Sequence, residues 1–157
     1  MKMKKTPSQS YTEQVNLVRD SDLNGSRRLF GGHLLAWIDI TAAIVARRHA
    51  ERNVTTVAID DLHFIAPAHA NDTVVLCGKM TYAGRTSMEI TVESYVERLD
   101  GTRSLINRAH VVMVALGPDD RPCEVPELVP ETEEEKAELL AGEKRKQLRI
   151  QRQTENY

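Results

Sequence analysis

The chain has 157 residues, which is enough for one domain with a sizeable hydrophobic core. Its hydrophobic fraction of 41% and charged fraction of 28% are ordinary for a globular protein, and a net charge of -2 predicts no general attraction to nucleic acid or anionic membranes. The two cysteines, Cys77 and Cys123, fit neither a disulfide framework nor a zinc pattern, so we expect a reduced, cytoplasmic protein.

The beginning of the chain is polar and basic. Residues 1–10 are expected to be a disordered tail, and they lack the apolar segment of about seven or more residues that a secretory signal needs. Residues 11–130 are expected to form the folded domain, with a first strand over residues 11–18. Turn-forming residues gather at positions 20–26 and predict a loop.

The dominant element is a helix expected over residues 32–49. Between His33 and Ala46 the only polar side chains are those of His33, Asp39 and Thr41. A helix that is apolar on nearly every face is typical of a protein interior, and this apolar run is shorter than the roughly 20 residues that a bilayer span needs. Asp39 is therefore exceptional, because a buried carboxylate is costly unless something compensates for it.

After this helix the pattern changes to strands. Four segments are rich in β-branched residues or alternate between apolar and polar side chains, and turn formers separate them: residues 54–64, 73–82, 87–97 and 103–116. Long strands joined by short turns predict an antiparallel meander. Because one sheet covers only one face of the apolar helix, we expect an identical partner to cover the rest.

The last region, residues 131–157, is expected to be a charged helix and tail. Its first half is acidic and its second half is basic, which complements the dipole of a helix. The basic end is expected to be a solvated face, with contact to nucleotide phosphates as the alternative.

Several short motifs resemble the acyl-CoA thioesterases of the hotdog superfamily, in particular the cytosolic acyl-CoA hydrolase type. They are Asn24-Gly25, Phe30-Gly31-Gly32, Trp37-Ile38-Asp39, residues 55–59, residues 64–67 and Gly84-Arg85-Thr86-Ser87-Met88. The resemblance extends over nearly the whole chain. It implies an α+β hotdog fold, in which a curved antiparallel sheet wraps around one long central helix, with a C-terminal helix added. It also implies a homodimer that pairs two sheets edge to edge, with a homohexamer, a trimer of dimers, as the larger assembly.

The same resemblance implies an enzyme of fatty acid metabolism that hydrolyses fatty acyl-CoA to free acid and coenzyme A. Thioester hydrolysis needs an activated water or a nucleophile, and a donor for the developing oxyanion. The resemblance assigns Asp39 as general base or nucleophile, with Asn24 reaching in from the other protomer. Gly32 lies where the helix begins, and backbone N–H groups lack partners there and favour negative charge; it is the expected oxyanion donor.

Substrate binding is assigned to Gly31, Phe64 and the turn Arg85-Thr86-Ser87. The missing Cβ of Gly31 lets a thioester carbonyl approach closely. The turn offers a cation and hydroxyls for the phosphate or pantetheine part of coenzyme A. No metal and no separate cofactor are expected, since coenzyme A is part of the substrate and product and the five histidines lack metal-ligand spacing. Neither nucleic-acid binding nor membrane insertion is expected.

Other interpretations stay open. Asn24-Gly25 is also an ordinary turn former, residues 31 and 32 would suit any tight turn into a helix, and Arg85-Thr86-Ser87 would serve simply as a strand turn. An acyl-CoA hydratase is a second function, but that branch carries a histidine five residues after the aspartate, where this chain has Ile44. A third is a protein that binds acyl-CoA without hydrolysing it, which need not keep Asp39.

Overall fold

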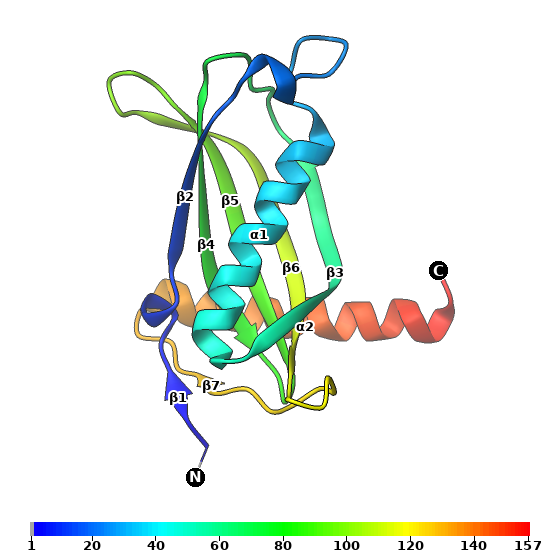
Figure 1. The fold of residues 1–157 in the computed structure, drawn as a ribbon. Coiled ribbons are helices and arrows are strands. Elements are labelled where there is room, and N and C mark those ends of the chain that lie inside the picture. The colour runs from blue at the N-terminus through cyan, green and yellow to red at the C-terminus, as the bar shows by residue number, and fades with distance from the viewer. Residues whose placement is uncertain (1) are drawn as a thin grey trace.

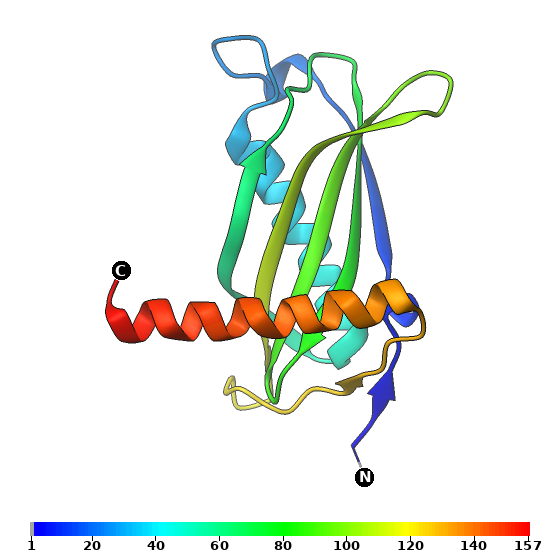
Figure 2. The ribbon, with the colours of Figure 1, turned by 180° about the vertical axis from the view of Figure 1, so that it is seen from behind.

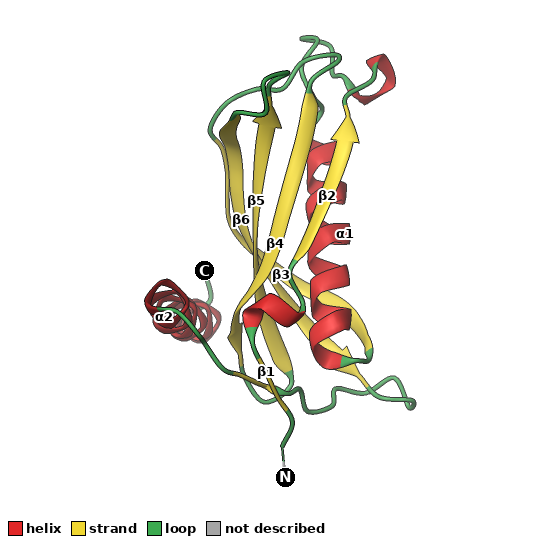
Figure 3. Cartoon of the chain, turned by 90° about the vertical axis from the view of Figure 1, so that its left-hand side faces the viewer, coloured by secondary structure: helices red, strands yellow, loops and turns green. Residues whose placement is uncertain are grey.

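The computed structural model describes residues 2–157 and consists of one antiparallel sheet with a helix on each face (Figure 1). The sheet contains β2 (Thr12–Leu17), β3 (Asn53–Phe64), β4 (Thr73–Ala83), β5 (Ser87–Glu97) and β6 (Arg103–Leu116). Helix α1 (Gly31–Ala50) lies in the concave face, and α2 (Glu133–Glu155) crosses the opposite face, as the edge-on view in Figure 3 shows. The expected fold, a curved sheet around a central helix with a C-terminal helix added, is confirmed.

The order of the strands is β2-β4-β5-β6-β3, so the predicted meander holds for β4, β5 and β6 only. The first strand after α1, β3, pairs with β6 at the far edge of the sheet instead of with β4. The chain then returns across one end of the sheet, where Ala68 accepts a hydrogen bond from the Leu29 N–H at 2.7 Å and Asp72 accepts one from the Val18 N–H at 2.9 Å. This crossover places α1 against the middle of the sheet.

One face of α1 forms the core. The buried residues of this face include Leu34, Ile38, Ala42 and Val45, and they pack against the inner side chains of the strands. A Cβ added at Gly78 on β4 would lie 3.0 Å from methyl groups of Thr41 and Val45, so glycine at this position allows the close packing of helix and sheet. The opposite face is open in a single chain, and 51% of Ile40 is exposed.

The first residues differ from the expected disordered tail. Strand β1 (Lys4–Lys5) pairs in parallel with β7 (Glu127–Leu128), and a single 3-10 turn, η1, follows at Pro7–Gln9. The Lys5 ammonium donates to the Arg48 carbonyl at 2.7 Å and lies 2.9 Å from the Glu51 carboxylate. Because these contacts neutralise the lysine at the C-terminal end of α1, a basic sequence is compatible here with ordered chain.

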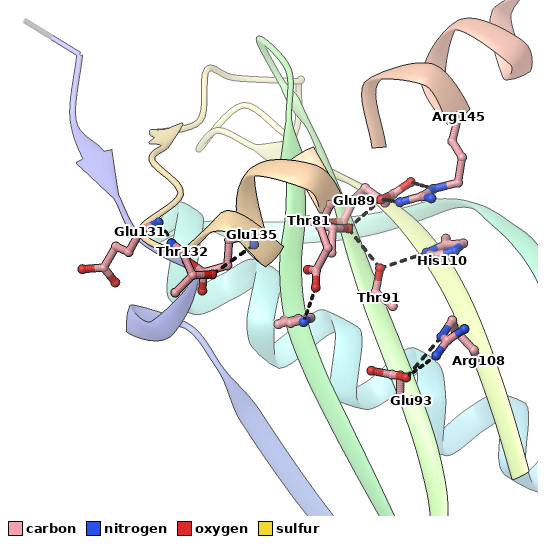
Figure 4. Close-up of polar contacts among 12 residues, drawn as sticks. Thr81, Glu89, Thr91, Glu93, Arg108, His110, Glu131, Thr132, Glu135 and Arg145 are labelled. Carbon is pink, nitrogen blue, oxygen red and sulfur yellow. Dashed lines mark hydrogen bonds and ion pairs between the residues drawn. The ribbon is translucent and has the colours of Figure 1, made fainter. Parts of the chain in front are cut away.

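Helix α2 begins with a capping box, in which the Thr132 hydroxyl accepts from the Glu135 N–H and the Glu135 side chain accepts from the Thr132 N–H. It contacts the sheet mainly through charged side chains. The ion pairs include Arg145 with Glu89 (Figure 4), Lys79 with Glu138, and Arg149 with Asp60. Its basic half is therefore partly buried against the sheet, where a solvated face was expected. Beyond β3 the helix projects past the sheet edge (Figure 2). Neither α1 nor α2 combines the length and apolarity needed to cross a lipid bilayer.

Candidate active site

The start of α1 is held in place by the loop before it. The Phe30 N–H donates to the Asp22 carbonyl at 2.8 Å, and Leu23 forms an isolated bridge with Leu29. Phe30 itself is the N-cap residue and offers no side-chain cap. The carbonyl of Phe30 accepts from the N–H groups of His33 and Leu34. The first two N–H groups of the helix, those of Gly31 and Gly32, have no hydrogen-bond acceptor within residues 2–157.

These two N–H groups are suited to an anion. They lie at the positive end of the α1 dipole, where a developing oxyanion is stabilised. The glycines also have a packing role, because a Cβ at Gly31 would be 3.3 Å from the ring of Phe64, and a Cβ at Gly32 would be 2.6 Å from the ring of Phe30. Two aromatic rings therefore lie against the helix start, and glycine leaves the room for them.

A groove of about 370 Å³ lies beside this helix start. Its polar end is formed by Asn24 and Arg28, and its apolar walls are Leu29, Gly31 and the segment 64–67. Phe64 is 55% exposed although it is aromatic. The groove thus places an exposed apolar wall beside the start of α1, an arrangement suited to a ligand that has both a polar group and an apolar chain.

Asn24 is a turn former in this structure. Its side-chain oxygen accepts from the N–H groups of Ser26 at 2.9 Å and Arg28 at 3.2 Å. The side-chain NH₂ has no acceptor within residues 2–157, and the residue is exposed. Both interpretations of Asn24 are therefore compatible, since the oxygen stabilises the turn while the amide N–H groups remain available to a ligand.

Asp39 lies on the stripe of α1 that also carries Leu35 and Ala43, and all three residues are half-buried. The Thr56 hydroxyl on β3 donates to the Asp39 carboxylate at 2.7 Å. A single chain therefore leaves the carboxylate partly open to solvent, because nothing covers this side of the helix. Thr56 lies within residues 55–59, one of the motifs that carry the resemblance, but no role was predicted for it, since a threonine in a strand rich in β-branched residues is unremarkable.

Asp39 and Gly32 of one chain are well separated. Their positions are seven residues apart, and at a rise of 1.5 Å per residue they are roughly 10 Å apart along the helix axis. Thr56 is likewise near the opposite end of β3 from Phe64, opposite Met113 on β6, whereas Phe64 is opposite Asn107. The structure thus separates the expected site residue Asp39, which contacts Thr56, from a second group of expected site residues. The second group consists of Gly31, Gly32, Asn24 and Phe64.

The turn Arg85-Thr86-Ser87 belongs to neither group. It connects β4 to β5 at the end of the sheet opposite the groove, near Met113 and Val114 of β6. Arg85 is exposed and Thr86 and Ser87 are half-buried. Within residues 2–157, no group of three or more histidine, cysteine, aspartate or glutamate residues is placed to hold a metal ion.

Comparison with known proteins shows that this chain is similar in sequence to acyl-CoA hydrolases. Residues 28–101 match the family model of the thioesterase superfamily. An uncharacterised acyl-CoA thioester hydrolase of Bacillus subtilis is 37% identical over 136 residues, which cover 83% of this chain and 79% of that protein. The rat cytosolic acyl coenzyme A thioester hydrolase is 32% identical over 143 residues, 89% of this chain but only 38% of that longer protein.

Solved structures agree. An acyl-CoA hydrolase from Staphylococcus aureus, in complex with butyryl coenzyme A, coenzyme A and coenzyme A disulfide, superposes with a TM-score of 0.92 at 31% identity, covering 97% of this chain and 93% of that one. A hexameric acyl-CoA thioesterase superposes with a TM-score of 0.91 at 37% identity, covering 96% and 97%. Structures also exist of variants of the S. aureus enzyme in which an aspartate, an asparagine or a threonine is replaced by alanine.

Proposed function

This chain belongs to the acyl-CoA thioester hydrolase family of the thioesterase superfamily, and on that premise we propose that it hydrolyses fatty acyl-CoA to the free acid and coenzyme A. The observation that carries the proposal is the Asp39 carboxylate, held by the Thr56 hydroxyl at 2.7 Å on the open side of an otherwise apolar helix. A carboxylate in that position can serve as general base or nucleophile once a second protomer covers the open side of the helix.

The proposed active site is composite. Asp39 and Thr56 come from one protomer, and Gly32, Asn24 and Phe64 come from its partner. Edge strand β3 supports this division, because it pairs with β6 on one side only. If two copies join β3 to β3 about a two-fold axis, the strands run antiparallel, and the end that holds Thr56 approaches the partner's end that holds Phe64. The dimer would thereby bring together the two groups that a single chain keeps apart.

Each group has a defined chemical role in this proposal. Asp39 acts as general base toward water or as nucleophile, and the Thr56 hydroxyl fixes its orientation. The Gly32 N–H at the helix start stabilises the oxyanion that forms on the thioester carbonyl. The Asn24 amide donates to the same carbonyl or to the attacking water. The residue types replaced in the S. aureus variants, aspartate, asparagine and threonine, are those present here.

Substrate contacts extend from this centre. The groove beside Gly31 and Phe64 accepts the acyl chain, and Arg85, Thr86 and Ser87 face the phosphate-bearing part of coenzyme A. The reaction needs no separate cofactor, because coenzyme A is part of the substrate. Hexameric relatives support a trimer of dimers as the assembly, and the similarity to a cytosolic hydrolase supports a cytoplasmic enzyme of fatty acid metabolism.

The test is release of free thiol from a panel of acyl-CoA esters of increasing chain length. We expect Asp39→Asn to lower kcat about 100-fold or more, since it removes the base or nucleophile. Asp119→Asn, in the exposed turn after β6, replaces a carboxylate that is not among the proposed site residues; it is the matched control and should keep full activity. A folded Asp39→Asn enzyme with the turnover of the unsubstituted protein would refute the role of Asp39.

The two alternative functions give different results in the same assay. A protein that only binds acyl-CoA releases no thiol from any ester, and a hydratase consumes the double bond of an enoyl-CoA while the thioester survives. No specific contact in the structure favours either one.

A further inference from the structure

Asp22 joins the loop before α1 to the start of the helix. Its carboxylate accepts from the Arg19 N–H at 2.9 Å, and its own N–H donates to the Arg19 carbonyl at 2.9 Å. Its carbonyl accepts from the Phe30 N–H at 2.8 Å. Only 12% of the Asp22 side chain is exposed, although most residues of this loop are on the surface. A buried acidic residue whose backbone and side chain are both hydrogen-bonded indicates that the junction of loop and helix is held in one arrangement.

His33, in the first turn of α1, makes a second contact with the same carbonyl. Its Nδ1 atom lies 3.3 Å from the Asp22 carbonyl oxygen and 3.8 Å from the Asp22 carboxylate. Since a carbonyl oxygen only accepts, Nδ1 must carry the proton of this hydrogen bond. The ring also meets the Phe30 ring edge to face, with centroids 5.5 Å apart and planes at 87°. Two contacts therefore hold the His33 ring on the loop side of the helix start.

This contact connects two hydrogen-bond donors of the proposed site. Asn24 follows Asp22 by two residues and begins a closed turn, in which its N–H donates to the Arg28 carbonyl at 2.8 Å. Gly32 directly precedes His33. Within residues 2–157, no other side-chain hydrogen bond joins the segment 19–30 to α1. The spacing between the Asn24 amide and the Gly32 N–H therefore depends on this link.

We propose that His33 is a positioning residue, which holds the loop that carries Asn24 against the start of α1 through the Asp22 carbonyl. Two donors stabilise one oxyanion only when both are held at the right distance from it, and a loosened loop loses that arrangement. The inference rests on the proposed function for the roles of Asn24 and Gly32. It adds a histidine that acts on the rate through the placement of these donors.

The first test compares two substitutions of this histidine. His33→Leu removes the donor, and we expect kcat for acyl-CoA to fall about fivefold with KM nearly unchanged, since one neutral hydrogen bond is lost. His33→Asn should restore most of the rate, because its side-chain N–H occupies the place of Nδ1. Equal losses of kcat in His33→Leu and His33→Asn would overturn the proposal.

The matched control is His69→Leu, which should keep the full rate. His69 also lies beside an aspartate, at 3.9 Å from Asp72, but it is exposed and its ring forms no hydrogen bond within residues 2–157. A loss of kcat in His69→Leu as large as in His33→Leu would contradict a specific role for the contact with Asp22.

Combination with Asn24→Ala separates positioning from a general loss of stability. If His33 acts through Asn24, His33→Leu should have almost no further effect on kcat once the Asn24 amide has been removed. A role confined to protein stability would give the same fivefold loss with and without Asn24→Ala, and that result would contradict the inference.

Hydrogen exchange measures the link between loop and helix without turnover. We expect His33→Leu to speed the exchange of backbone N–H groups in residues 19–30 about fivefold, while those of β4, β5 and β6 keep their rates. Equal acceleration throughout the chain, or none anywhere, would refute a local link. Local loosening in a protein that hydrolyses no thioester would refute the proposed function and support the link. Full hydrolysis with an unchanged kcat in His33→Leu would support the proposed function and refute the positioning role.

Discussion

The Asp39 side chain has two rotatable bonds and a half-exposed position, so the helix alone does not fix its oxygens. The hydrogen bond from Thr56 fixes them, because β3 is paired with β6 in the sheet. The Thr56 hydroxyl is therefore held at a fixed position, and the carboxylate must orient toward it. Thr56 is therefore a positioning residue, and its influence on the reaction passes through Asp39.

Replacing Thr56 by valine removes the hydroxyl and keeps the volume. We expect kcat to fall about tenfold with little change in KM, since one hydrogen bond to a charged group is lost. Thr56→Ser keeps a donor and should restore most of the rate. Thr55→Val changes the exposed neighbouring threonine and serves as the control. If Thr56→Ser loses as much activity as Thr56→Val, shape rather than the hydrogen bond matters at this position.

Some residues of this site can be predicted from the sequence, and others cannot. Asp39 is recognisable because a single carboxylate interrupts a long apolar helix, and the glycines are recognisable by their place before it. Thr56 is not, because its contact with Asp39 joins residues 17 apart through the fold. The contact of His33 with the Asp22 carbonyl depends in the same way on how the loop returns to the start of α1, which no local pattern contains.

At the scale of secondary-structure elements, a buried ion pair between Arg145 and Glu89 attaches α2 to the sheet. Glu89 on β5 is 1% exposed, and both its oxygens accept hydrogen bonds from Arg145 at 2.7 and 2.8 Å. A further hydrogen bond comes from the Thr81 hydroxyl (Figure 4). Burial opposes ionisation of this carboxyl, but the bonds from Arg145 and Thr81 outweigh it and hold the pKa of Glu89 below its ordinary value of 4.5. The charge pattern of the chain predicts the helix, but not that a glutamate inside the sheet binds its basic half.

Arg145→Met should destabilise the protein by about 3 kcal/mol, because it removes both hydrogen bonds that Arg145 donates to the buried Glu89 carboxylate and leaves only the more distant guanidinium of Arg149, at 3.9 Å, beside it. Urea unfolding followed by circular dichroism measures the change. Glu89→Gln combined with Arg145→Met removes both charges and should recover a large part of the loss. If the single and double variants are equally unstable, the ion pair is not the cause.

The pair also gives stability a pH dependence of known sign. Because the pKa of Glu89 is lowered on folding, its contribution is complete above 4.5, the ordinary value, and is lost as the pH falls through the pKa of the folded state. The free energy of unfolding of the unsubstituted protein should therefore fall more steeply below that pH than that of the double variant. Parallel curves for the two proteins would contradict this account of the pair.

At the scale of the whole molecule, the single chain is incomplete on one side. The sequence predicts this incompleteness, since a helix apolar on nearly every face needs more cover than one sheet supplies, and the structure leaves Ile40 exposed as that reasoning requires. That β3 would be one of the two edge strands, with β2 as the other, could not be predicted. Placing β3 at the far edge beside β6 depends on a crossover between strands of similar composition, and local patterns favour pairing with the next strand along the chain.

Strand β3 is therefore the surface on which the proposed dimer depends. It is a long edge strand with unpaired backbone groups and an exposed apolar side chain, Val57, at 55% exposure. Such an edge pairs with another chain unless charge or distortion prevents it. We expect Val57→Asp to shift the mass measured by light scattering from that of two or six chains toward that of one. Activity should fall with it, because Asp39 and Gly32 then no longer meet across the interface.

The control is Leu99→Asp, which alters a fully exposed leucine at the distant hairpin tip and should change neither the mass nor the activity. A Val57→Asp protein that is monomeric and fully active would exclude the composite site, and one that keeps the unsubstituted mass would place the interface elsewhere.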